Sequence, residues 1–71
     1  MSLQLKTLAI LGIDDHGIVA ADIAQQNGFE VYFFDDQYPV RKSCGHWDVV
    51  GNYDDLKLHG DRYDAVFVAL S

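Results

Sequence analysis

Residues 7–19 have the sequence TLAILGIDDHGIV, in which an apolar run ends at Gly12 and a helical pattern opens at Gly17. This order predicts a strand, a tight turn and a helix. Gly12 lets the backbone leave the strand without a Cβ clash, and Gly17 lets the first helical turn lie close to the strand. Because the N–H groups at a helix start favour an anion, the turn predicts a site for a phosphate.

Two carboxylates distinguish this turn from a standard phosphate loop. In the full dinucleotide-binding fingerprint a middle glycine lets the phosphate approach, and Asp14 stands at that position. Asp14 and Asp15 also have a simpler explanation, because acidic residues are favoured where a helix begins. Whether the turn binds a phosphate or only starts a helix, these carboxylates can accept the same N–H groups that a phosphate would use.

Length and composition limit the function. The chain has 71 residues, 49% of them hydrophobic and one of them proline, so it is expected to fold as a single domain. A dinucleotide-binding domain needs two mononucleotide-binding halves, and this length holds one. It therefore favours a mononucleotide or a nucleotide-sugar over NAD.

The charge and the single cysteine limit the expected binding partners and the expected cellular compartment. The chain carries 11 acidic and 5 basic residues, a formal net charge of −6. This charge repels nucleic acids and anionic membranes, so neither is an expected partner. Cys44 cannot form an intrachain disulfide, and the sequence shows neither a signal-peptide pattern nor an apolar run of bilayer-spanning length. We therefore expect a cytoplasmic protein.

Hydrophobic periodicity predicts six elements of secondary structure. The strands are expected over residues 5–11, 30–34, 49–50 and 63–70, and the helices over residues 17–27 and from the N-cap Asn52 to near Gly60. Residues 1–4 are expected to fray, and residues 35–48 to form a long surface loop. Together the elements predict an α/β fold, a half-Rossmann unit in three layers (α/β/α). Its four-stranded parallel sheet would have the order 3-2-1-4, with the strands numbered along the chain and the helices on opposite faces.

Asp35 and Asp36 follow the second predicted strand. If the first two strands are adjacent and parallel, these carboxylates emerge beside the Gly12 turn. Asp35 lies 23 residues after Gly12, close to the separation of about 20 at which an acidic residue meets a ribose hydroxyl. The pair therefore predicts a ribose clamp. The alternative is that both residues end a strand and start a turn, as aspartates often do.

Four other polar residues have two alternative roles or a structural one. His16 could donate to a phosphate or a sugar hydroxyl as a neutral imidazole, or lie exposed in a loop. The adjacent basic pair Arg41 and Lys42 could reach a diphosphate, or form a solvated loop. His59 suits the carboxyl end of the second helix and is expected to be structural.

We predict neither a metal site nor a catalytic centre. Cys44, His46 and Asp48 have side chains that can ligate metals, but one Cys and one His lack the paired spacing of a zinc site. A nucleophile, a base and an orienting acid cannot be assembled from this sequence.

Residues 8–24, LAILGIDDHGIVAADIA, with FFDD at 33–36, resemble the N-terminal domain of the sialic acid O-acetyltransferase family. That family includes bacterial acetyltransferases that act on UDP-linked amino sugars. The histidine-glycine pair at 16–17, the paired aspartates and YDAVFVA at 63–69 carry the resemblance, which spans nearly the whole chain. It implies a domain that holds the UDP part of a sugar nucleotide. It also implies a separate left-handed parallel β-helix that carries the catalytic histidine and the acetyl-CoA site and forms trimers. These 71 residues contain none of that second domain.

The resemblance also implies roles for individual residues. The candidate contacts to a UDP-sugar are Gly12, His16, Gly17, Asp35 and Asp36, and no residue inherits a catalytic role. No cofactor is expected in this domain, because acetyl-CoA would bind only the second domain of a full-length relative. Asp14 and Asp15 complete the candidate site, but they replace the small residues of the family's turn, and the family continues beyond Ser71 with a glycine and a helix.

These observations favour a UDP-sugar-binding domain of a sugar O- or N-acyltransferase that is not catalytic by itself. One rival is a degenerate interaction or oligomerisation module without a ligand. Another is an NAD-linked redox fragment, for which the chain is too short by about half. Because the last strand is followed by no helix, part of one sheet face would be uncovered, which favours a homo-oligomer.

Overall fold

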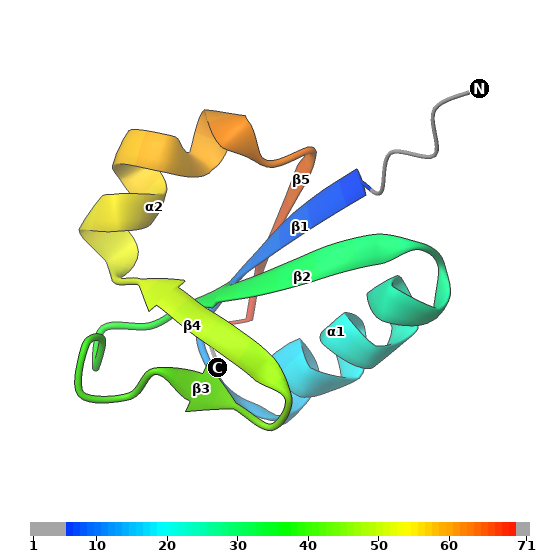
Figure 1. Cartoon of the computed structure of the whole chain (residues 1–71), viewed down its shortest axis with the longest axis horizontal. Coiled ribbons are helices and arrows are strands. Elements are labelled where there is room, and N and C mark those ends of the chain that lie inside the picture. The colour runs from blue at the N-terminus through cyan, green and yellow to red at the C-terminus, as the bar shows by residue number, and fades with distance from the viewer. Residues whose placement is uncertain (1–5, 70–71) are drawn as a thin grey trace.

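The computed structural model describes residues 6–69 (Figure 1). In chain order the elements are β1 (Lys6–Leu11), α1 (Asp15–Gln26), β2 (Phe29–Phe34), β3 (Ser43–Cys44), β4 (Trp47–Gly51), α2 (Tyr53–His59), the 3-10 helix η1 (Gly60–Arg62) and β5 (Ala65–Val68). The expectations for residues 1–5 and for residue 70 lie outside the described residues. No helix of the described part is long and apolar enough to cross a membrane.

The sheet has five strands in the order β3-β4-β2-β1-β5. β1 pairs in parallel with β2 and β5, and β2 pairs in parallel with β4. β3 is antiparallel to β4. The α/β class is therefore confirmed, whereas the four-stranded, all-parallel sheet of order 3-2-1-4 is wrong. The edge strand β3 is not among the predicted strands. The four predicted strands are β1, β2, β4 and β5, and their order in the sheet, β4-β2-β1-β5, is the predicted one.

The region expected to be a loop contains a small hairpin. β3 and the first half of β4 are joined through Gly45, whose φ of 62° lies in the left-handed region that favours glycine. A strand of two residues is too short to produce a hydrophobic alternation, so the sequence pattern did not indicate it. β4 is correspondingly longer than the predicted strand at 49–50, because its core residue Trp47 precedes that pair.

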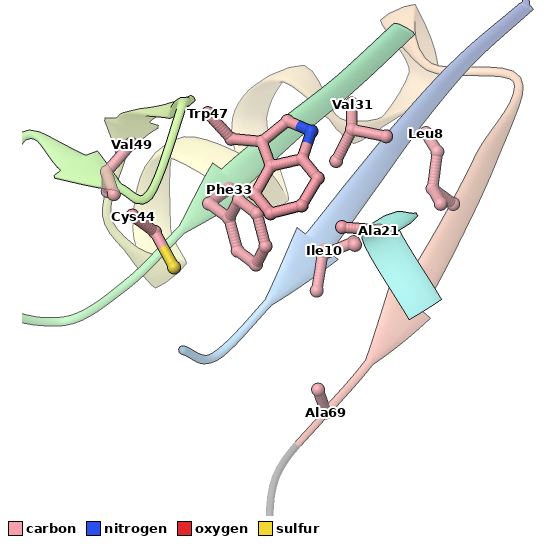
Figure 2. Packing of buried hydrophobic residues seen from close by; sticks show 9 residues of the cluster. All are labelled: Leu8, Ile10, Ala21, Val31, Phe33, Cys44, Trp47, Val49 and Ala69. Carbon is pink, nitrogen blue, oxygen red and sulfur yellow. The ribbon is translucent and has the colours of Figure 1, made fainter. Parts of the chain in front are cut away.

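The two helices cover opposite faces of the sheet, as expected (Figure 1). α1 contacts β1 and β2, and α2 contacts β2 and β4. The main core lies on the α1 face (Figure 2), where Ile10 and Phe33 are fully buried. Burying side chains of this size stabilises the fold by about 1.5–3 kcal/mol each. The remaining core residues on this face are Leu8, Ala21, Val31, Cys44, Trp47, Val49 and Ala69.

Helix capping explains where both helices begin. The predicted N-cap Asn52 is confirmed: its Oδ1 accepts from the Asp55 N–H at 2.9 Å, and Asp55 Oδ2 accepts from the Asn52 N–H at 2.9 Å. α1 begins at Asp15 rather than at the expected Gly17, because Asp14 is its N-cap. Because Asp14 caps the helix, α1 begins two residues earlier than predicted and closer to the end of β1.

Candidate functional site

Hydrogen bonds between neighbouring strands bring the candidate segments together at the carboxyl edge of the sheet. The Gly12 N–H donates to the Phe34 carbonyl at 2.8 Å, and the Asp35 N–H donates to the Gly51 carbonyl at 3.0 Å. On the other side, the Ala69 N–H donates to the Leu11 carbonyl at 2.8 Å. The turn after β1 therefore lies between the segments that follow β2 and β5, and directly beside Asp35.

Both glycines of the turn are required by geometry. Gly12 has a φ of 97°, which other residues rarely adopt. A Cβ on Gly17 would lie 3.0 Å from the Gly12 carbonyl oxygen and 3.1 Å from the Ala69 Cβ. Gly17 therefore allows the start of α1 to lie close to the strands, as the sequence predicts.

Asp14 occupies part of the helix start. Its Oδ1 accepts from the Gly17 N–H at 2.9 Å, and its carbonyl accepts from the Ile18 N–H at 3.0 Å. The Asp15 and His16 N–H groups are the other donors at this end of α1. The His16 side chain is 82% exposed, and its Nδ1 lies 3.9 Å from Asp14 Oδ2. Asp14 is thus turned into the site, whereas the side chains of Asp15 and His16 face solvent.

The structure separates the two aspartates after β2. Asp35 is 9% exposed, its Oδ2 accepts from the Gln37 N–H at 3.0 Å, and its carbonyl accepts from the Tyr38 N–H at 3.1 Å. These contacts match the turn-forming alternative for Asp35. Asp36 is exposed at the same edge, so its carboxylate is the more accessible of the two.

Tyr53, at the start of α2, joins this site although the sequence pattern did not single it out. Burial raises the pKa of the Tyr53 phenol, and the nearby carboxylates of Asp36 and Asp35 raise it further. The signal that could have found it is topological, because the segment after β4 must emerge beside the segment after β2. The link between these segments is the bond from the Asp35 N–H to the Gly51 carbonyl, two residues before Tyr53.

A cavity of about 370 Å³ adjoins the site on the α2 face. Its walls include Phe34, Tyr38 and Tyr63, and Tyr63 packs edge-on against Phe34 with ring centroids 5.6 Å apart. His59 and Arg62 supply its basic groups. The pair at 41–42 is exposed and does not line this cavity, and the Arg41 N–H donates to the Gln37 carbonyl at 3.0 Å in the loop that follows Asp35.

The cysteine of the β3–β4 hairpin belongs to the core. Cys44 is buried, and burial raises the pKa of its thiol, which keeps the sulfur protonated at neutral pH. His46 instead stacks on Trp47, with ring centroids 4.0 Å apart, and its Nε2 lies 2.9 Å from Gln25 Oε1. The potential ligands Cys44 and His46 therefore have separate packing roles.

Comparison with protein families gives an independent result. Residues 7–71 match the model of the PglD N-terminal domain, a range that contains both the Gly12 turn and the aspartate pair. Searches of curated proteins and of solved structures gave no significant match. The match covers nearly the whole chain and confirms the resemblance to an acetyltransferase N-terminal domain. The chain belongs to the family of PglD N-terminal domains, the N-terminal domains of PglD-like acetyltransferases.

Proposed function

We propose that this chain is the substrate-binding domain of a sugar O- or N-acyltransferase and that it holds the nucleotide part of a UDP-linked sugar. The observation that carries the proposal is the bond between the Gly12 N–H and the Phe34 carbonyl, because it sets an anion-favouring turn beside Asp35 and Asp36. Membership of an acetyltransferase N-terminal family supports the same role. In this proposal the domain binds substrate and takes no part in acyl transfer, and acetyl-CoA belongs to a separate domain.

Each part of the ligand has a matching group in the site. The diphosphate would lie at the start of α1, against the N–H groups of Asp15 and His16. The carboxylate of Asp36 would accept from a ribose hydroxyl or from the base. Tyr38 and Tyr63, which line the cavity beside the buried Phe34, would contact the uracil, and Tyr53 would close the edge beside it.

A second candidate function is an interaction module that retains the fold and has no ligand. Two observations favour it. The carboxylate of Asp14 already uses the Gly17 N–H, and β5 exposes Val66, Phe67 and Val68 at the edge of the sheet. Exposed apolar surface of this kind is often an interface.

Thermal unfolding with ligands separates the two candidates. A ligand at about ten times its Kd stabilises the folded state by about 1.4 kcal/mol, which raises the Tm of a domain of this size by about 5–10 °C. We expect UDP and a UDP-sugar to raise the Tm in the millimolar range, and NAD to have a smaller effect at equal concentration. No shift with UDP at 10 mM, about ten times a Kd of 1 mM, would favour the interaction module.

A further inference from the structure

β2 and β4 separate toward the amino end of β2 (Figure 1). Within the described residues, only Phe33 and Phe34 of β2 pair with β4, and the register shifts between them. A cavity of about 400 Å³ lies where the strands part, between the first half of β2, the β3–β4 hairpin and the end of α1. It lies at the opposite end of β2 from Asp35, so it is separate from the proposed nucleotide site.

The backbone of β2 offers unpaired groups to this cavity. The Phe34 carbonyl points toward β1, where it accepts from Gly12, and the Asp35 N–H points toward β4. Because the backbone groups of a strand alternate in direction, Val31 and Phe29 direct their N–H and C=O groups toward the β4 side. β4 does not reach them there. Val31 and Phe29 therefore have no strand partner on this side, which is the arrangement to which extended peptides add, and Val31 itself is 8% exposed.

One wall of the cavity contains a buried donor without an acceptor. Trp47 is 9% exposed, and its indole Nε1 has no hydrogen-bond partner among the described residues. Figure 2 shows this nitrogen on the side of the ring that points toward Val31, which also lines the cavity. A buried N–H normally has a partner, so a ligand that offers a carbonyl oxygen would complete the site.

The other wall is acidic. Glu30, Tyr32 and Asp48 line the cavity, and none of the lining residues within 6–69 is Lys or Arg. Strand alternation places these three on the α2 face, whereas Val31 and Trp47 belong to the core on the α1 face. The two carboxylates beside an aromatic ring favour a cation.

We propose that this cavity binds an extended peptide segment with the pattern apolar, basic, apolar. The peptide would pair with the free edge of β2 at Val31, its basic side chain would lie between Glu30 and Asp48, and a peptide carbonyl would accept from Trp47 Nε1. Extended chains place alternate side chains on opposite faces, so the two apolar neighbours meet the Trp47 wall. This site and partner are independent of UDP binding.

The fluorescence of Trp47 tests the proposal directly, because it is the only tryptophan in the chain. The probe is N-acetyl-Val-Arg-Val-amide. One control peptide carries neutral citrulline in place of arginine, and agmatine provides the guanidinium without a peptide backbone. We expect a saturable change in Trp47 emission with the arginine peptide, at least tenfold weaker binding of the citrulline peptide, and at least tenfold weaker binding of agmatine. Equal binding of the two peptides, equal binding of agmatine, or no emission change at millimolar peptide would overturn the proposal.

Variants of the carboxylates give a second test. Glu30→Gln and Asp48→Asn should each weaken binding of the arginine peptide about threefold or more, and the double variant should weaken it about tenfold. Both substitutions should leave binding of the citrulline peptide unchanged. Asp54→Asn, which removes an exposed charge on α2, is the matched control and should change neither. Circular dichroism and the Tm verify folding, and UDP titration of the same variants should give the wild-type affinity. Arginine-peptide binding that is insensitive to both substitutions would contradict the assigned contacts.

Discussion

The carboxylate of Asp14 accepts the N–H of Gly17 at 2.9 Å, so the first turn of α1 is capped by an anion of the protein itself. A phosphate at the same helix start would lose this donor and would also meet a like charge. At about 6 Å and an effective dielectric of about 40, two unit charges repel by roughly 1.4 kcal/mol, a factor of about ten in affinity. The native affinity for UDP should therefore be weak.

Asp14→Gly, alone or with Asp15→Gly, should strengthen UDP binding by at least roughly tenfold. Asp14→Asn keeps a capping oxygen and removes the charge, so it should recover only part of the gain. Glycine is tolerated at an N-cap, and the cost in stability should be a few tenths of a kcal/mol. Calorimetry with UDP measures all three variants. If the glycine variants bind UDP more weakly than the wild type when magnesium is present, but not when it is absent, the aspartates instead hold a magnesium ion that bridges to the phosphates.

Asp36→Ala should weaken UDP binding tenfold to a hundredfold without changing the Tm. Asp36 is exposed, and losing one charge-assisted hydrogen bond costs about 1.5–3 kcal/mol. Asp35→Ala should weaken binding and also lower the free energy of unfolding by about 1 kcal/mol, because the Gln37 N–H loses its acceptor. Asp61→Ala controls for the loss of one exposed charge. A double variant at 35 and 36 that stays folded and binds UDP normally would exclude the ribose clamp.

Gly17→Ala should destabilise the domain by about 1–3 kcal/mol, although alanine favours helices. The new Cβ would meet the Gly12 carbonyl oxygen at 3.0 Å, and both partners belong to the packed carboxyl edge of the sheet. Gly60→Ala is the matched control, because its Cβ would meet only Leu56 at 3.7 Å and its φ is −60°. Urea unfolding compares the two. Equal stabilities would show that the start of α1 can move away from the strand.

The sequence specified most of the fold through residues that act locally. Gly12, Gly17 and Asn52 fix a turn, a close approach and a helix cap by their own chemistry, and the structure places each in that role. Strand β3 depends on pairing with β4 and has only two residues, so no periodic pattern in the sequence indicated it. Its position follows from where Trp47 packs against Phe33, which is a tertiary contact.

The candidate site was only partly predictable for the same reason. Local spacing placed Asp35 beside Gly12, because both follow adjacent strands. Spacing could not show that Asp35 would turn inward while Asp36 stays exposed, since the contacts of Asp35 with the Gln37 and Tyr38 N–H groups form only in the folded turn. Tyr53 reaches the site only through the pairing of β2 with β4.

The domain should self-associate through β5 at high micromolar concentration. β5 is an edge strand without a charged residue, and Val66 and Val68 are 47% and 58% exposed. Such an edge can pair with another strand. Val68→Lys should keep the domain monomeric, whereas Val40→Lys, at a residue that is 93% exposed in a loop, should not. Sedimentation of the wild type as a monomer over the whole range would contradict this prediction.

Glu30→Gln should lower the pKa of Tyr32 from about 12 toward the ordinary tyrosine value of about 10. The hydrogen bond from the Tyr32 hydroxyl to the Glu30 carboxylate is the main cause of the raised pKa, followed by burial and by the charge of Glu30. Because the folded state holds this proton more tightly than the unfolded state, the stabilisation is present below pH 10 and is lost as the pH rises toward 12. The absorbance of phenolate during alkaline titration measures the change, with Tyr32→Phe identifying the transition. A titration of Tyr32 that is the same in wild type and Glu30→Gln would show that Glu30 does not hold the phenol.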